Sequence, residues 1–131
     1  MPRVPEPLVV DASALVEFLL DTTKGYAVAA RLKGSTAHTP AHADAEVLSA
    51  FGRLHRAGDL DAQIARRELA SLAARPIVRH PVGDLLGAAW GMRENVRLAD
   101  AIYVALAERL DATLITTDAR LARASGAELV G

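Results

Sequence analysis

Apolar residues occur along this chain in short runs that alternate with stretches of helical periodicity. Runs of the kind expected for buried strands lie at 8–10, 36–39, 77–80, 113–116 and 128–130. Between them, apolar positions spaced three or four apart predict helices at 14–20, 23–32, 41–57, 61–74, 83–94, 98–110 and 119–125. Strands separated by helices are typical of an α/β fold with a mainly parallel sheet and helices on both faces. We expect residues 1–131 to form a single domain, since this length buries an adequate core.

The amino-acid composition excludes several kinds of functional site. The chain has no cysteine, which excludes disulfides, zinc–thiolate sites and thiol catalysis. Residues 1–7 contain no apolar run resembling a signal peptide, and no apolar stretch approaches about 18 residues, so we expect a cytoplasmic protein that does not enter a membrane. The net charge of −1 indicates no bulk attraction to nucleic acid. Arginine greatly outnumbers lysine, which suits phosphate contacts, although a high-GC coding bias explains it equally well.

Two aspartates occupy positions where an α/β sheet places ligands, and a third begins a predicted helix. Asp11 and Asp118 directly follow apolar runs, so both belong at the carboxyl ends of strands, where the ligand crevice of such sheets lies. Each is equally well explained as a turn or helix-capping residue. Asp100 begins a helix whose residues 101–107 are all apolar or aromatic, which predicts burial. Its alternative role is to complement the positive end of that helix dipole.

A glutamate on the helix predicted at 41–57 completes the set. Glu46 lies about a quarter turn from an apolar stripe, at the rim of the predicted core; the stripe consists of Ala43, Val47, Ala50 and Leu54. Taken alone, Glu46 is as well explained as a surface residue. Asp44 lies further round the helix and suits a site less. Ser13 is predicted to cap the helix that follows the first strand.

A cluster of these carboxylates needs a counter-charge. Two carboxylates about 5 Å apart repel by roughly 3 kcal/mol at an effective dielectric constant near 20. Three or four of them must therefore take up protons, pair with arginines or bind a cation. Oxygen-only ligands favour Mg²⁺ or Mn²⁺, and such an ion activates water and neutralises phosphate oxygens. The four acids together thus predict a site for phosphoryl chemistry.

Four blocks around these acids resemble, in order, the four motifs of PIN domains. The blocks are residues 9–15, 45–48, 98–107 and 114–122. The resemblance covers essentially the whole chain, and the Asp-Ala-Ile-Tyr-Val-Ala-Leu-Ala run at 100–107 is especially similar to VapC-type toxins of bacterial toxin–antitoxin pairs. It implies a three-layer α/β/α fold and a Mg²⁺- or Mn²⁺-dependent endoribonuclease. By analogy with that family we also expect a protein antitoxin as partner, RNA as substrate, and a homodimer.

The resemblance also implies roles for single residues. Asp11, Asp100 and Asp118 would hold the ion, while Glu46 would bind it or orient the attacking water. The 3′ oxygen of the RNA phosphodiester would be the leaving group. Some relatives carry a further acid directly after the last aspartate, where this chain has Ala119, so the number of metal ions stays open.

Other polar residues near these blocks have two explanations each. Ser13 and Thr116 match positions where the family places hydroxyls beside the acids, but helix capping and strand propensity explain them equally. Arg93 and Arg97 precede the third acid and suit contacts to substrate phosphates, or are solvated arginines at a helix end. We expect Trp90 to pack in the core rather than to stack on a base.

The remaining candidates are structural or rest on analogy. The four histidines show no paired metal-ligand spacing, so we interpret them as structural or surface residues; they are His38, His42, His55 and His80. Apolar residues on the first two helices suit a groove for an antitoxin segment, although core burial explains most of them; they are Phe18, Leu19, Leu20, Tyr26 and Leu32.

Two alternative functions remain open. One is a metal-dependent phosphatase on a related α/β fold, but the Asp-x-Asp start of aspartate-nucleophile phosphatases is absent because Ser13 takes the second position. Receiver domains also need a late lysine, and none follows Lys33. The other alternative is a non-catalytic PIN-fold scaffold, which the retention of all four acids disfavours.

Overall fold

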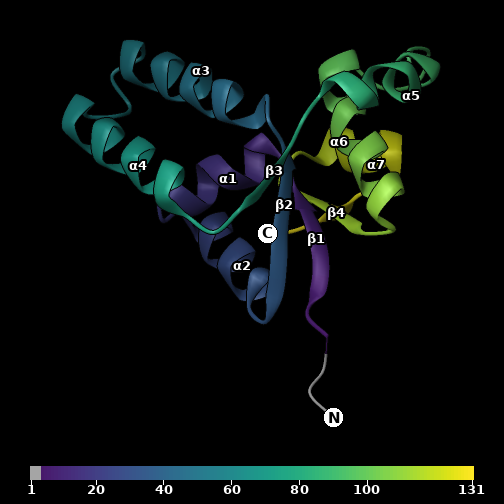
Figure 1. Ribbon diagram of the computed structural model, residues 1–131. Helices are drawn as coiled ribbons and strands as arrows, with labels where there is room; N and C mark the ends of the chain where they lie inside the picture. The colour runs from purple at the N-terminus through teal and green to yellow at the C-terminus, as the bar shows by residue number, and fades with distance from the viewer. Residues whose placement is uncertain (1–3) are drawn as a thin grey trace.

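Five parallel strands form one sheet in the order β3-β2-β1-β4-β5 (Figure 1). The computed structural model describes residues 4–131, so the expectation that no signal peptide begins the chain falls partly outside it. The predicted strands are all confirmed, within two residues at each end. Their bounds are β1 Glu6–Val10, β2 Ser35–Pro40, β3 Val78–His80, β4 Thr113–Thr116 and β5 Glu128–Leu129.

The helices cover both faces of this sheet, which confirms the expected three-layer arrangement. In Figure 1, α1–α4 lie on one side of the strands and α5–α7 on the other. The α-helices are α1 Ala12–Leu19, α2 Thr23–Leu32, α3 Ala43–Arg56, α4 Ala62–Ala74, α5 Leu86–Gly91, α6 Leu98–Leu110 and α7 Ala119–Ser125. Within residues 4–131, no helix combines the length and apolar character needed to cross a membrane.

The connections place a crevice at the centre of the sheet. The chain moves outward from β1 to β2 and β3, then returns to the other side of β1 to form β4 and β5. β1 and β4 are therefore neighbours whose connections lead to opposite sides, and Val10 pairs with Ile115 in their register. Open α/β sheets bind ligands beyond the carboxyl ends of two such strands.

The last three residues of the central strand lie in the core. Leu8, Val9 and Val10 of β1 are 0% exposed, because helices cover both faces of the strand. This explains why β1 is a continuous apolar run rather than an alternating one. The short strand β3 lies at an edge of the sheet, the position in which prolines such as the flanking Pro76 and Pro81 are tolerated.

The helix predicted at 83–94 is longer than the helix in the structure, and the expectation that Trp90 packs in the core is wrong. A 3₁₀ turn over Gly83–Leu85 leads into the short α5, which ends at Gly91. The element buries Leu85 and Ala89, four residues apart, and this leaves the Trp90 side chain on the outer face with 59% of its surface exposed. The Arg93 guanidinium lies over its ring, 5.0 Å from the centroid.

Candidate active site

All four predicted acids line one cavity of about 590 Å³ at the carboxyl end of the sheet. Each comes from the start of a different helix or from its capping position. Asp11 follows β1 and caps α1, Glu46 lies in the first turn of α3, and Asp100 lies in the first turn of α6. Asp118 follows β4 and caps α7. The fold therefore brings together carboxylates that are up to 107 residues apart in the chain.

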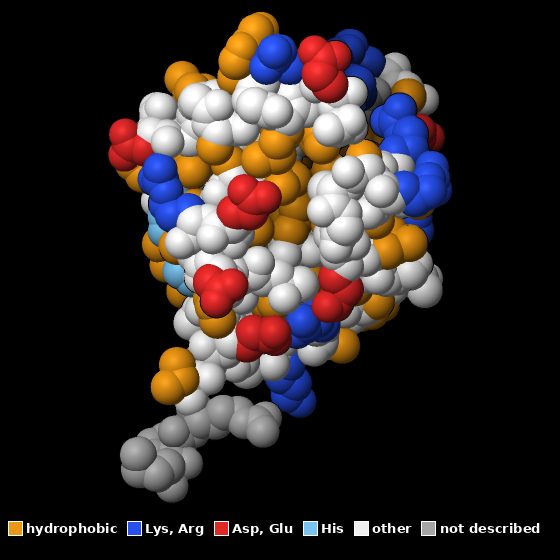
Figure 2. All heavy atoms as spheres, turned by 90° about the vertical axis from the view of Figure 1, so that its right-hand side faces the viewer, with side chains coloured by type: hydrophobic (Ala, Val, Ile, Leu, Met, Phe, Trp, Pro, Cys, Tyr) orange, Lys and Arg blue, Asp and Glu red, His pale blue; other side chains and the backbone are white. Residues whose placement is uncertain are grey.

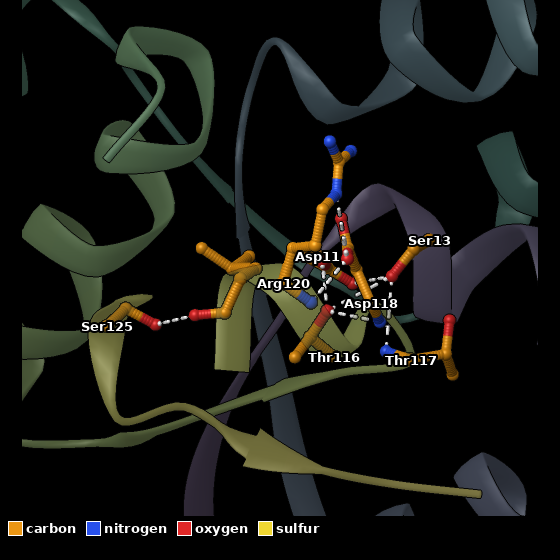
Figure 3. A network of polar contacts seen from close by, with 8 residues as sticks. Asp11, Ser13, Thr116, Thr117, Asp118, Arg120 and Ser125 are labelled. Atoms are coloured by element: carbon orange, nitrogen blue, oxygen red, sulfur yellow. Dashed lines mark hydrogen bonds and ion pairs between the residues drawn. The ribbon is translucent and has the colours of Figure 1, made fainter. Parts of the chain in front are cut away.

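Asp11 is the most constrained of the acids, and only 5% of its surface is exposed. Its Oδ1 accepts hydrogen bonds from the Ala14 N–H at 2.9 Å and from the Ser13 hydroxyl at 2.7 Å. Its Oδ2 accepts from the Thr116 hydroxyl at 2.6 Å (Figure 3). The expectation that Ser13 caps α1 is wrong, because Asp11 itself caps the helix and Ser13 donates to Asp11.

The two hydroxyls also tie the end of β4 to the start of α1. The Thr117 N–H donates to the Ser13 hydroxyl at 3.1 Å, and the Asp118 N–H donates to the Thr116 hydroxyl at 3.0 Å. The two hydroxyl oxygens are 3.1 Å apart, as Figure 3 shows. The network thus fixes Asp11 relative to the backbone that carries Asp118.

Glu46 is held by groups that the sequence did not single out. The buried Tyr103 hydroxyl on α6 donates to Glu46 Oε1 at 2.5 Å. Burial and the neighbouring Glu46 carboxylate raise the pKa of Tyr103 above its ordinary value, so the hydroxyl stays protonated. His42 Nε2 lies 3.4 Å from the same carboxylate oxygen. Helical spacing was the signal that could have found both residues. Tyr103 lies three residues after Asp100, and His42 lies four residues before Glu46.

Burial and neighbouring acids raise the pKa values of Asp11 and Asp100. Burial raises the pKa of the Asp11 carboxyl, although its three hydrogen bonds oppose this shift, and the charge of Asp100 adds to the rise. Burial also raises the pKa of Asp100, where Arg97 acts against the shift. The charges of Glu46 and Asp118 raise the pKa of Asp100 further. The cavity therefore holds more negative charge than its arginines neutralise.

This donor set fits a hard divalent cation. The carboxylates supply only oxygen, the ligand type that Mg²⁺ and Mn²⁺ prefer. His42 donates toward the Ala99 carbonyl, 3.1 Å from its Nε2, rather than presenting a nitrogen lone pair to the cavity. As the side chains stand, no three Asp, Glu or His residues among those described converge closely enough to hold an ion. Binding one therefore requires side-chain rotation at the rim of the cavity.

Arginines flank the acids on two sides. Arg97 and Arg53 both line the main cavity, and a smaller adjoining cavity of about 140 Å³ extends from Arg97 to Arg120. Sequence reasoning missed Arg53, which lies seven residues after Glu46 and hence on the same face of α3. Arg93 is not among the residues that line either cavity. Its guanidinium instead donates to the Trp90 carbonyl at 3.1 Å.

Comparison with known proteins agrees with this fold and site. A family profile described as PIN domain matches residues 8–127, so the chain belongs to the PIN-domain family. Ribonuclease VapC3 of Mycobacterium tuberculosis is 50% identical over 121 residues, which cover 92% of this chain and 88% of that protein. This relationship places the chain among the VapC ribonucleases and confirms the resemblance seen in the motifs.

Solved structures confirm the fold. The crystal structure of PAE2754 from Pyrobaculum aerophilum superposes with a TM-score of 0.66 at 25% sequence identity, over 93% of this chain and 82% of that one. A toxin–antitoxin complex from Klebsiella pneumoniae contains a chain that superposes with a TM-score of 0.62 at 16% identity. That match covers 85% of this chain and 86% of the other, and it supports the architecture alone.

Proposed function

We propose that this protein is a Mg²⁺- or Mn²⁺-dependent endoribonuclease and the toxin of a type II toxin–antitoxin pair. One observation carries the proposal: carboxylates from four separate segments line a single cavity beyond the carboxyl ends of β1 and β4, and Arg53 and Arg97 line the same cavity. The identity to ribonuclease VapC3 supports RNA as the substrate. Because RNA is then the target, we place the activity in the cytoplasm.

The four acids and the two neighbouring hydroxyls have different roles in the proposed reaction. Asp11, Asp100 and Asp118 would hold the divalent ion, which when bound lowers the pKa of water and neutralises charge on the phosphate. Glu46 accepts the proton of the attacking water or fixes its orientation. The water oxygen bonds to phosphorus, the P–O3′ bond breaks in line with it, and the 3′ oxygen leaves and takes up a proton. Ser13 and Thr116 hold the Asp11 carboxylate with their hydroxyls.

The experiment that tests this function is cleavage-site mapping on total bacterial RNA. The purified protein is incubated with Mg²⁺, with Mn²⁺ or with EDTA, and new 5′ ends are mapped. We expect discrete cuts with either metal and about a hundredfold less cleavage in EDTA, because the acids alone repel the phosphate. Cleavage that is unaffected by EDTA would contradict the metal dependence. Expression in bacteria should arrest growth, and indifferent growth would contradict the role as a toxin.

Arg53 and Arg97 are the proposed phosphate contacts of the substrate. We expect Arg53→Ala to raise KM for RNA about fivefold to tenfold with little change in kcat, because the lost contact is to a phosphate away from the reacting one. The slope of log KM against log salt concentration should fall by about one, the change expected when one phosphate contact is lost. Arg93→Ala is the matched control, since it removes the same charge outside the cavity. Equal effects of both variants would show that only net charge matters.

We further propose a protein antitoxin as partner and a homodimer as the free form. Figure 2 shows hydrophobic side chains gathered on the face formed by α5–α7. Leu86, Trp90 and Leu98 on these elements are between 47% and 59% exposed, which supports self-association of this face. In the candidate antitoxin groove, Leu19 is buried and Tyr26 is 66% exposed, so Tyr26 is the residue there best placed to contact a partner.

A further inference from the structure

Two residues outside the set of acids converge on Glu46. The Tyr103 hydroxyl donates to Glu46 Oε1 at 2.5 Å, and His42 Nε2 lies 3.4 Å from the same oxygen. The Tyr103 and His42 rings pack against each other with centroids 4.8 Å apart. We propose that Tyr103 and His42 are positioning residues: Tyr103 fixes Glu46 Oε1 by its hydrogen bond, and His42 holds the Tyr103 ring and the start of α3, so that Glu46 is directed toward the ion and the attacking water. This inference rests on the proposed function.

The hydrogen-bond directions support this role. A carboxylate only accepts, so the Tyr103 hydroxyl is the donor in its contact with Glu46. His42 Nε2 is also 3.1 Å from the Ala99 carbonyl oxygen, which again only accepts, so this nitrogen carries a hydrogen. The single Nε2 hydrogen of His42 is thus directed to Ala99, and Tyr103 is the residue that donates to Oε1, while the His42 ring lies beside that oxygen. Oε2 has no hydrogen-bond partner among residues 4–131 and is the oxygen that remains for the cavity.

Glu46 needs such an anchor because of where it stands. Glu46 lies in the first turn of α3, and a third of its side chain is exposed. A glutamate side chain has three rotatable bonds, so without an anchor it would sample many conformations in solvent. Tyr103 is 1% exposed and belongs to α6, the helix that carries Asp100 one turn earlier. The hydrogen bond therefore ties α3 to the helix of another proposed ligand. A misplacement of about 1 Å in such a constellation lowers activity substantially.

His42 provides a second, independent observation. Its Nδ1 atom is buried and has no hydrogen-bond partner in the described part of the chain. A buried polar atom without a partner destabilises the fold, and an apolar ring of similar size would avoid this. The unpartnered Nδ1 of His42 thus disfavours folding, while its Nε2 ties the start of α3, the helix of Glu46, to the Ala99 carbonyl of α6. A purely structural residue would show no such conflict.

The test begins with Tyr103→Phe, which keeps the buried ring and removes only the hydroxyl. We expect kcat for RNA cleavage to fall tenfold to a hundredfold with KM for RNA unchanged, as for lost partners of metal ligands. Mn²⁺ binding, followed by electron paramagnetic resonance on the RNA-free protein, should weaken by a similar factor. Thr36→Val removes a hydroxyl from an exposed side chain outside both cavities and is the control, with no expected change.

Two further variants separate positioning from a general structural role. In a Glu46→Ala background, Tyr103→Phe should cause no additional loss of kcat, because the group that it positions is gone. His42→Phe should lower kcat at least tenfold while the melting temperature stays equal or rises. If Tyr103→Phe fails to fold, His42→Phe alone decides the question by the same two measurements.

Several outcomes would overturn the inference. Tyr103→Phe with wild-type kcat and wild-type Mn²⁺ affinity contradicts it, as does a loss of kcat that is the same with and without Glu46. His42→Phe that loses stability and activity in parallel would reduce His42 to a packing residue. A wild-type protein that binds Mn²⁺ but cleaves no RNA would contradict only the proposed function, since the Mn²⁺ comparison still tests the positioning.

Discussion

Replacing Asp100 with asparagine is expected to lower RNA cleavage by at least about a hundredfold without unfolding the protein. The substitution removes one negative charge from the proposed ion site and keeps the size of the side chain. Asp100 is half-buried in the first turn of α6, where asparagine also fits. The measurement is the single-turnover rate on a mapped RNA site with saturating Mg²⁺.

Stability should move in the opposite direction in metal-free buffer. Burial and the charges of Glu46 and Asp118 raise the pKa of Asp100 in the folded state, so the folded protein binds this proton more tightly than the unfolded chain does. The carboxyl therefore contributes less stability as pH rises from about 4, its unfolded pKa, through the raised folded value. We expect Asp100→Asn to become more stable relative to wild type as pH rises above about 4.

Added Mg²⁺ should reverse that order, because an ion that binds only the folded wild type stabilises it by mass action. Urea unfolding at several pH values, with and without Mg²⁺, measures both effects. Asp59→Asn on the exposed loop after α3 is the control and should change neither cleavage nor the Mg²⁺ response. An Asp100→Asn protein with wild-type cleavage, purified free of other nucleases, would refute the site.

The second large effect is expected from Gly25→Ala, which should destabilise the protein by about 3 kcal/mol. A Cβ atom on Gly25 would lie only 2.0 Å from the Glu17 backbone oxygen, so α2 would have to move away from α1. This contact involves backbone, which cannot rotate aside as a side chain can. Thermal unfolding should show a melting temperature lower by roughly 10 °C.

Gly87→Ala provides the matched control for this substitution. Gly87 lies inside the short α5, and a Cβ atom there meets nothing within 4 Å. Alanine should be neutral or stabilising by up to about 1 kcal/mol, since it favours the helix. Equal stability of the two alanine variants would show that α1 and α2 do not pack as closely as described.

The strands and most helices followed from local pattern alone. β1 is a continuous apolar run because both of its faces are buried, and α6 is apolar all round because it packs between the sheet and α5. The helix predicted at 83–94 was too long because its first turn is a 3₁₀ turn over Gly83–Leu85 and α5 ends at Gly91, and its apolar residues do not all face the core. Trp90 was misplaced for this reason, since periodicity does not reveal which face of a short helix meets the sheet.

The acids of the site were predictable from sequence, but the groups around them were not. Asp11 and Asp118 could be placed at one edge of the sheet because the carboxyl ends of parallel strands lie there. The contact between Tyr103 and Glu46 depends on how α3 crosses α6, which no local pattern specifies. Arg53 enters the cavity for the same reason, and as an exposed residue at the end of α3 it carries no pattern of its own.

Asp11 is the N-cap of α1 and also a proposed metal ligand. These two roles limit which residues can replace Asp11 during evolution. A descendant that gave up cleavage could not discard the residue freely, because most replacements would also unravel the start of α1. Asparagine and serine preserve the cap while losing the charge. Inactive descendants of this protein should therefore carry one of those two residues at position 11 rather than alanine.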